Sequence, residues 1–275
     1  MARGEKESKC LEAVKSVLMS HDNICYACSF EDDDIIQRLF KTARPNSDLN
    51  KFPDFICENG FIEHFEVTSS YSNRNGSKMR IELDDLQKKA NARESELQEQ
   101  MNEEPSYAVK SVFTDKWHSA HSYEYFCNSF KARWEHHIDR LGKYDGNKTI
   151  GCFMIQYDDS ALCLDVIYPD VKTEIYYGDL LKIPDYGGYR LTHDSNMLEY
   201  IYQFRYKIQY VAFYNNDKFH RKRYEIICVE NIPEILKIVK GKYEFHCAMI
   251  GTAHTFYGIS TPNPLFKGSD NNDQT

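Results

Sequence analysis

The sequence lacks an apolar run of the roughly 20 residues that a membrane helix requires. No apolar segment follows its charged start, so we expect no secretory signal and a cytoplasmic location. Glycine-rich phosphate loops of the Walker and dinucleotide-binding types are absent as well. The sequence therefore predicts a protein without a membrane partner and without a nucleotide loop of either type.

An excess of positive charge is also missing. The chain has 34 Lys and Arg residues against 42 Asp and Glu residues, which gives a net charge of −8 and a pI of about 5.7. Binding to nucleic acid through a broad basic surface is therefore not expected. A local Lys/Arg patch, or a site whose own charge metal ions offset, stays compatible with this balance.

Cysteine is present but not in paired motifs. The nine cysteines are scattered, and an odd count without an export signal indicates reduced thiols. Cys25 and Cys28 have the C-x-x-C spacing, but no second pair follows at zinc-ligand spacing. We interpret these two cysteines as structural.

The composition is that of a folded protein with an aromatic-rich core. The chain has 275 residues, 41% of them apolar, including 20 tyrosines and 16 phenylalanines. One large domain, or a core with an elaboration, is expected at this length. We predict a core over residues 1–170, a C-terminal elaboration packed on it over 171–266, and a disordered tail over 267–275.

Hydrophobic periodicity predicts alternating helices and strands. Apolar residues at spacings of three and four indicate helices, and short β-prone runs indicate strands. The helices are expected at 7–19, from 31 to about 43, and at 79–103, 117–141 and 234–239. The strands are expected at 23–30, 149–156, 161–167, 209–214, 223–229 and within 245–259.

The strongest local signal is a β-hairpin around an Asn-Gly turn. Two β-prone segments, Phe52–Cys57 and Phe61–Thr68, flank the tripeptide Glu58-Asn59-Gly60. Each arm carries a carboxylate, Asp54 on the first and Glu66 on the second. Two carboxylates on rigid strands suit a hard divalent cation such as Mg²⁺.

The length of the loop decides whether these carboxylates share a face. A two-residue loop, Asn59-Gly60, would turn Asp54 to the opposite face from Glu66. A three-residue loop, Glu58-Asn59-Gly60, places Asp54 opposite His64, and side chains alternate so that Glu66 then shares its face. We predict the three-residue loop, in which the glycine adopts the left-handed conformation, because it explains both acids.

This arrangement resembles the signature of the PD-(D/E)XK nuclease superfamily. Pro53-Asp54, a hairpin and then Glu66-Val67-Thr68 follow its pattern of Pro-Asp and (Asp/Glu)-x-Lys. The resemblance covers roughly residues 1–170 through the order of elements. It implies an α/β fold with a mixed sheet, a restriction-endonuclease-like αβββαβ core, and a C-terminal β-rich elaboration. It also implies a Mg²⁺- or Mn²⁺-dependent endonuclease with Asp54 and Glu66 as metal ligands.

The sequence departs from that pattern at Thr68, where the superfamily has its lysine. A hydroxyl can bond a phosphate or a water but carries no charge. Some members place the lysine on a nearby element or lose it, and Lys78 is the nearest candidate here. The alternative for Lys78 is an exposed lysine after a Gly-Ser loop. If no cation replaces it, a catalytically inactive nuclease-like binding or interaction module is the competing prediction.

Three further residues are candidates for supporting roles. His64 shares the inferred face and could contact metal or water, or be a satisfied core histidine. Gln156 lies on the strand after the long helix and could hydrogen-bond near the site. Glu12, on the first helix, could join the acids, or be a solvated helix residue.

A basic loop is the best candidate contact for nucleic acid. It lies between two predicted strands, and aromatic residues beside it could stack on bases. Its cations are Lys218, Arg221, Lys222 and Arg223. The alternative is a solvated hairpin tip. The expected partner is nucleic acid, with DNA as the first choice, and a homodimer stays open.

Overall fold

The structure is a computed structural model that divides into two compact units. It describes residues 4–20, 24–48, 51–73, 76–103, 108–118, 120–157, 159, 161–166, 188–215, 223–247 and 251–260. Unit 1 comprises Met1–Ser72 and Ala120–Ala248, and unit 2 comprises Asn73–Ser119 and Met249–Thr275. The units therefore divide the chain at other points than the expected boundary near residue 170.

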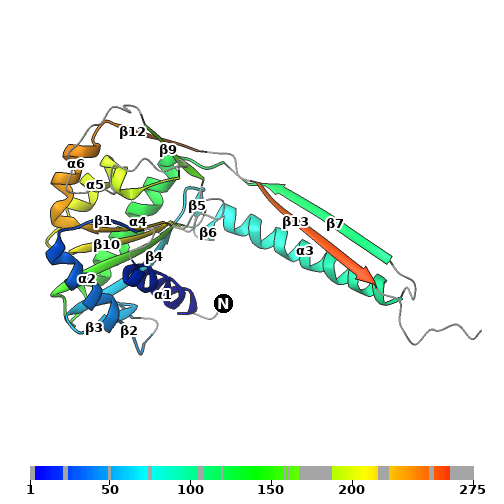
Figure 1. The fold of residues 1–275 in the computed structure, drawn as a ribbon, viewed down its shortest axis with the longest axis horizontal. Helices are drawn as coiled ribbons and strands as arrows, with labels where there is room; N and C mark the ends of the chain where they lie inside the picture. The colour runs from blue at the N-terminus through cyan, green and yellow to red at the C-terminus, as the bar shows by residue number, and fades with distance from the viewer. Residues whose placement is uncertain are drawn as a thin grey trace, which may run out of the picture. The chain divides into compact units, whose positions relative to one another are not determined.

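Unit 1 is built on a mixed seven-stranded sheet, as the predicted fold class requires (Figure 1). Strands β4, β8 and β10 are mutually parallel, whereas β3 and β11 are antiparallel to β4 and β10. The spatial order is β1 (Ile24–Ala27), β11 (Arg223–Cys228), β10 (Tyr210–Asn215), β8 (Ile150–Tyr157), β4 (Gly60–Val67), β3 (Phe55–Cys57) and β2 (Arg44–Pro45).

Helices cover both faces of this sheet. On one face lie α1 (Glu5–Ser20) and α2 (Phe30–Thr42), and on the other lie α4 (Tyr123–Gly142), α5 (Ser195–Tyr202) and α6 (Ile232–Val239). The 3₁₀ helices η1 (Leu191–His193) and η2 (Val229–Asn231) precede α5 and α6. A separate antiparallel pair joins β9 (Leu162–Val166) to β12 (Tyr243–Cys247).

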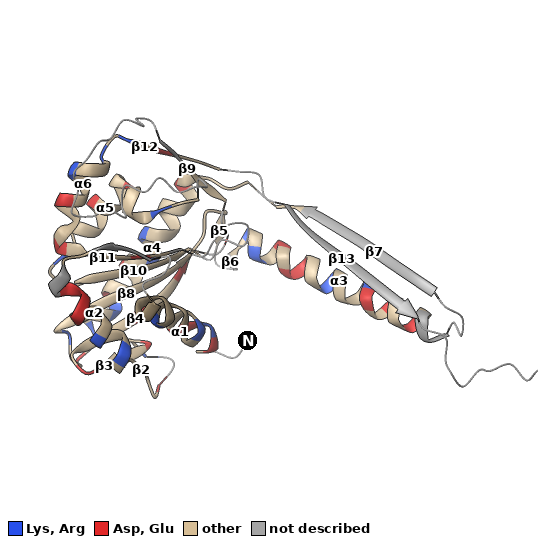
Figure 2. Cartoon of the chain, in the orientation of Figure 1, with Lys and Arg blue, Asp and Glu red and all other residues tan. Residues whose placement is uncertain are grey.

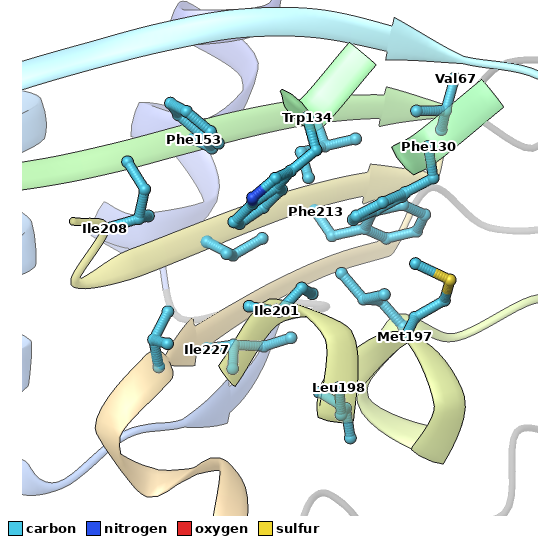
Figure 3. Close-up of a cluster of buried hydrophobic side chains, with 14 of the residues drawn as sticks. Val67, Phe130, Trp134, Phe153, Met197, Leu198, Ile201, Ile208, Phe213 and Ile227 are labelled. Atoms are coloured by element: carbon cyan, nitrogen blue, oxygen red, sulfur yellow. The ribbon is translucent and has the colours of Figure 1, made fainter. Parts of the chain in front are cut away.

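The face under α4 carries the larger aromatic cluster, shown in part in Figure 3. Phe130 and Trp134 are fully buried on α4, and their rings stack at 5.7 Å between centroids. Phe153 on β8 meets the Trp134 ring edge-on at 4.8 Å. The 3–4 spacing of apolar residues therefore predicted the buried face of α4 correctly.

The predicted hairpin exists, but its predicted register is wrong. Cys57 pairs with Gly60, so the loop has two residues, Glu58 and Asn59, rather than three. The observed loop also differs from the two-residue alternative, Asn59-Gly60, because Gly60 belongs to the ladder. One residue before the first ladder pair, Asp54 falls opposite Glu63 instead of His64.

The reason for this register is that β4 lies very close to β8. A Cβ on Gly60 would come within 1.8 Å of the Ile150 carbonyl oxygen. The glycine is needed because the backbone of β8 occupies that space, and Gly60 is not in the left-handed conformation. The neighbouring strand, which is distant in sequence, therefore determines the loop.

Unit 2 consists of one long helix and a two-stranded ladder. Helix α3 (Lys78–Glu103) contacts both β7 (Ala108–Trp117) and β13 (Gly251–Ser260), which are antiparallel. Figure 2 shows acidic and basic residues interspersed along α3. Two short strands, β5 (Ser72–Asn73) and β6 (Gly76–Ser77), precede α3. The helix predicted from residue 117 begins only at Tyr123, because Trp117 ends β7.

Among the residues described, no helix combines the length and the apolar character needed to cross a membrane.

Candidate functional site

The first turn of α1 brings charge to the end of β4. The buried stripe of this helix begins at Cys10 and Leu11, and Lys6 and Glu7 lie one turn before it. Lys6 Nζ lies 2.5 Å from Glu66 Oε1. Both side chains are mostly buried, with exposed fractions of 26% for Lys6 and 31% for Glu66. The α1 face that packs on the sheet therefore ends in a cation that pairs with the predicted metal ligand.

Glu66 lies beside two polar residues on the same face of the sheet. The parallel pairing of β4 with β8 sets Glu66 next to Gln156. His64, two residues earlier on β4, has its Nε2 3.1 Å from Gln156 Oε1, and both side chains are buried. The structure thus brings together three of the residues that the sequence singled out.

Asp54 reaches this group by a different route from the predicted one. Its Oδ2 accepts the backbone N–H of His64 at 2.9 Å, a donor that lies in the plane of the sheet. Burial lowers the pKa of His64, although the charges of Glu66 and Asp54 both act to raise it. His64 is thus bonded to Asp54 through its backbone and to Gln156 through its ring.

The ionisation of Asp54 is unusual for an aspartate. Burial, with a further contribution from the charge of Glu63, raises its pKa to about 6. The hydrogen bond from the His64 N–H acts in the opposite direction. A buried carboxylate with so little compensation would gain from a nearby cation.

The chemistry of the donors, rather than a preformed cluster, is what suits this part of the sheet to a hard cation. The donors available at this site are carboxylate oxygens, which Mg²⁺ and Mn²⁺ prefer. Within the described part of the chain, no group of three or more His, Cys, Asp or Glu side chains is arranged to hold a metal. Mg²⁺ commonly uses only one or two protein carboxylates, so Asp54 and Glu66 are the candidate ligands, although the observed register sets Asp54 opposite Glu63, which lies on the other face of the sheet from Glu66.

Thr68, which the sequence resemblance aligns with the lysine of the nuclease signature, takes part in a separate network. Its hydroxyl donates to Asp159, which also accepts the Ser69 N–H at 2.6 Å and the Ser69 hydroxyl at 2.7 Å. The Ser70 N–H in turn donates to Thr68 Oγ1 at 3.1 Å. Thr68 therefore helps to satisfy a buried aspartate beyond the end of β4.

Of the other predicted site residues, Glu12 does not join this group. Glu12 lies on the exposed side of α1, where it pairs with Lys15 at 3.0 Å. Lys78 is the exposed first residue of α3 and belongs to unit 2. The cations Lys218, Arg221 and Lys222 lie outside the described residues, as does the side chain of Arg223, the first residue of β11.

Two residues of α1 were missed at the sequence level: Lys6, which pairs with Glu66, and Glu7, whose charge acts to raise the pKa values of Asp54, Glu63 and His64. The available signal was their position one helical turn before the buried stripe of α1, which extends the same face of the helix. Charged residues in a first turn are common on exposed helices, so this signal alone did not separate them from Glu12.

No family model, curated protein or solved structure matches this chain.

Proposed function

We propose that unit 1 is a metal-dependent nuclease core that acts on nucleic acid, with DNA as the first substrate to test. The observation that carries this proposal is the contact of Lys6 with Glu66, two residues along β4 from His64, whose backbone N–H donates to the buried carboxylate of Asp54. Lys6 would supply a cation to a site whose signature lysine is replaced by Thr68.

The order of elements supports the same proposal. A helix is followed by the antiparallel strands β2, β3 and β4, then by α4, and then by β8 parallel to β4. This sequence of elements has the form αβββαβ that the resemblance implies. Unit 2 interrupts it between β4 and α4.

The residues of the site have distinct roles in this proposal. Asp54 and Glu66 would hold Mg²⁺ or Mn²⁺, which when bound polarises a phosphodiester and lowers the pKa of an attacking water. Gln156 and His64 would orient Glu66 and its neighbours, because their mutual hydrogen bond fixes both side chains. The Lys6 ammonium would meet negative charge that develops on the phosphate.

The test is cleavage of plasmid, single-stranded DNA and RNA with Mg²⁺ or Mn²⁺. We expect Asp54→Ala and Glu66→Ala to reduce cleavage by about 10²-fold or more. Glu12→Ala is the matched control, since it removes an exposed carboxylate from α1. Absence of cleavage by the wild type on all three substrates would overturn the proposal, as would equal activity of Asp54→Ala.

Metal binding gives a second, independent measurement. We expect weak Mg²⁺ or Mn²⁺ binding that depends on both acids, measured by calorimetry. Equal affinity in the wild type and in Glu66→Ala would rule out the assigned metal site.

A nuclease-like binding module without catalysis is the second candidate. The engagement of the Thr68 hydroxyl with Asp159 favours it, because a structural role has replaced the lysine of the signature. The net charge of −8 also favours a partner other than a broad stretch of nucleic acid. Binding of nucleic acid without cleavage would select this candidate.

A further inference from the structure

A fully buried carboxylate, Glu63, faces α4 on the other side of the sheet from Glu66. Its Oε1 accepts hydrogen bonds from His137 Nδ1 at 2.6 Å and from Arg140 Nη1 at 2.8 Å. Its Oε2 accepts the backbone N–H of Asp54 at 2.8 Å. A single side chain therefore links α4 to Asp54, the residue directly before β3.

The link is needed because the ladder between β3 and β4 stops at Phe55. Asp54 lies outside the ladder, and its N–H donates to the Glu63 carboxylate instead of to a carbonyl of β4. The Asp54 carboxylate in turn accepts the N–H of His64. The side chains of Glu63 and Asp54 therefore connect the two chain segments beyond the last backbone pair. Glu63 accepts the N–H of Asp54, and Asp54 accepts the N–H of His64.

The partners of Glu63 are themselves fixed. The His137 ring stacks on Phe65, with centroids 4.8 Å apart and an angle of 13° between the planes. The guanidinium of Arg140 lies over the ring of Phe52, 5.7 Å from its centroid. Glu63 is consequently held at one end by packed groups of α4 and holds Asp54 at the other.

We propose that Glu63 is a positioning residue, which fixes the backbone of Asp54 and so directs the Asp54 carboxylate to the candidate metal site. The expected effect on metal binding rests on the proposed function, whereas the hydrogen bonds of Glu63 do not. Residues that orient a metal ligand typically change metal affinity or activity by about 10–100-fold when they are removed.

The ionisation of the two carboxylates agrees with this geometry. The charge of Glu63 adds to burial in raising the pKa of Asp54. Burial also raises the pKa of Glu63 to about 7, while Arg140 acts to lower it. Burial lowers the pKa of His137 to about 4, so its neutral ring can donate the Nδ1 hydrogen to Glu63.

The experiment compares three substitutions in the full-length protein. Glu63→Gln keeps an acceptor for the Asp54 N–H, Glu63→Met keeps the approximate volume without an acceptor, and Glu63→Asp keeps the charge but shortens the reach. Two quantities are measured, the hydrogen-exchange protection of the Asp54 amide and the affinity for Mn²⁺. The control is Glu225→Gln, which alters another buried carboxylate of the same sheet that accepts a backbone N–H, that of Leu191 at 2.7 Å.

We expect Glu63→Met and Glu63→Asp to lose protection of the Asp54 amide and to weaken Mn²⁺ binding by about tenfold or more. Glu225→Gln should stay close to the wild type in both measurements, whereas Glu63→Gln should fall between the wild type and Glu63→Met, because its single carbonyl oxygen cannot serve both Asp54 and the donors of α4. If Glu63→Met does not fold, Glu63→Asp decides, because it retains the charge that His137 and Arg140 require.

Retained protection of the Asp54 amide in the Met and Asp variants would overturn the positioning role. So would unchanged Mn²⁺ affinity in variants whose amide has lost protection. If the wild type binds no Mn²⁺, the proposed function fails. The amide measurement then still decides whether Glu63 holds Asp54.

Discussion

Asp54 is a residue whose ionisation opposes folding. Its pKa is about 6 in the folded protein against a usual value of 3.8, so the folded state binds its proton more tightly. Stability is therefore lost as the pH rises from about 4 to above 6. We expect Asp54→Asn to raise the free energy of unfolding by about 1–2 kcal/mol near pH 8 and by much less near pH 4.5.

The measurement is urea unfolding at the two pH values, with a chelator present so that no cation compensates the charge. Asp34→Asn, which changes an exposed residue of α2, is the control and should have little effect at either pH. An equal effect of Asp54→Asn at both pH values would contradict the raised pKa. A stabilising loss of a charged group is common at sites that serve function rather than stability.

Lys6 gives a second prediction at the scale of single residues, and it depends on the proposed function. We expect Lys6→Ala to reduce cleavage by about 10²–10³-fold, because a positioned donor or cation typically contributes that much. Folding should be nearly unchanged, since partly exposed ion pairs contribute at most about 1 kcal/mol. Activity assays and thermal unfolding measure the two effects.

The matched control is Lys9→Ala, which removes a lysine from the same helix that pairs with Glu5. Lys78→Ala tests the original candidate for the missing lysine. Loss of cleavage in Lys78→Ala, together with full activity of Lys6→Ala, would move the cationic role from α1 to α3. Full activity of both variants would leave catalysis without either lysine and contradict the role given to Lys6.

At the scale of elements, the contact of β4 with β8 is the most constrained. A Cβ at Gly60 would lie 1.8 Å from the Ile150 carbonyl oxygen, which is backbone and cannot move aside cheaply. We expect Gly60→Ala to lower the free energy of unfolding by about 3 kcal/mol or more, because two paired strands would have to separate locally.

Gly142→Ala is the control for this substitution. It lies at the end of α4, and a Cβ there would meet no atom within 4 Å. Chemical denaturation of both variants gives the comparison. A Gly60→Ala protein as stable as Gly142→Ala would contradict the close approach of β4 to β8.

The elements themselves were largely predictable, because their signals are local. The stripe of Leu11, Val14 and Leu18 predicted α1, and these residues are buried. The register of the hairpin was not predictable. From the sequence alone Gly60 resembles a turn glycine, and its close contact with the distant strand β8 has no local signal. The pairing of β7 with β13 was not predicted for the same reason, because the two strands lie far apart in sequence.

The same limit applied to the site. Asp54, Glu66, His64 and Gln156 were found from the motif and the alternation of strands. The common face of Glu66, His64 and Gln156 was therefore anticipated, whereas the predicted register that set Asp54 opposite His64 was wrong. The hydrogen bonds of Glu63 to α4 and to Asp54 join residues that no local pattern relates.

At the scale of the whole molecule, unit 1 is assembled from two separated stretches of chain. Its sheet joins them twice, because β1 and β4 of the first stretch pair with β11 and β8 of the second. Unit 2 is inserted after β4 and takes its second strand, β13, from the C-terminal part of the chain. A boundary drawn once along the sequence could not describe this arrangement.

The two ends of the first insertion are joined within unit 1. Ser70 and His121 form an isolated antiparallel bridge, and the Ser122 N–H donates to the Ser69 carbonyl at 2.9 Å. Residues paired in this way have Cα atoms about 4.5–5.5 Å apart. A linker of about four Gly and Ser residues could therefore replace residues 73–119.

We expect a chain with that linker, ending at Ala248, to fold as unit 1 alone. The aromatic cluster under α4 and the cluster under α1 and α2 both lie within it, so the buried core is retained. Cooperative unfolding and dispersed amide resonances in NMR spectra would confirm an independent unit. A non-cooperative transition with collapsed resonances would show that unit 1 depends on unit 2, whereas retained Mn²⁺ affinity would place the candidate metal site entirely in unit 1.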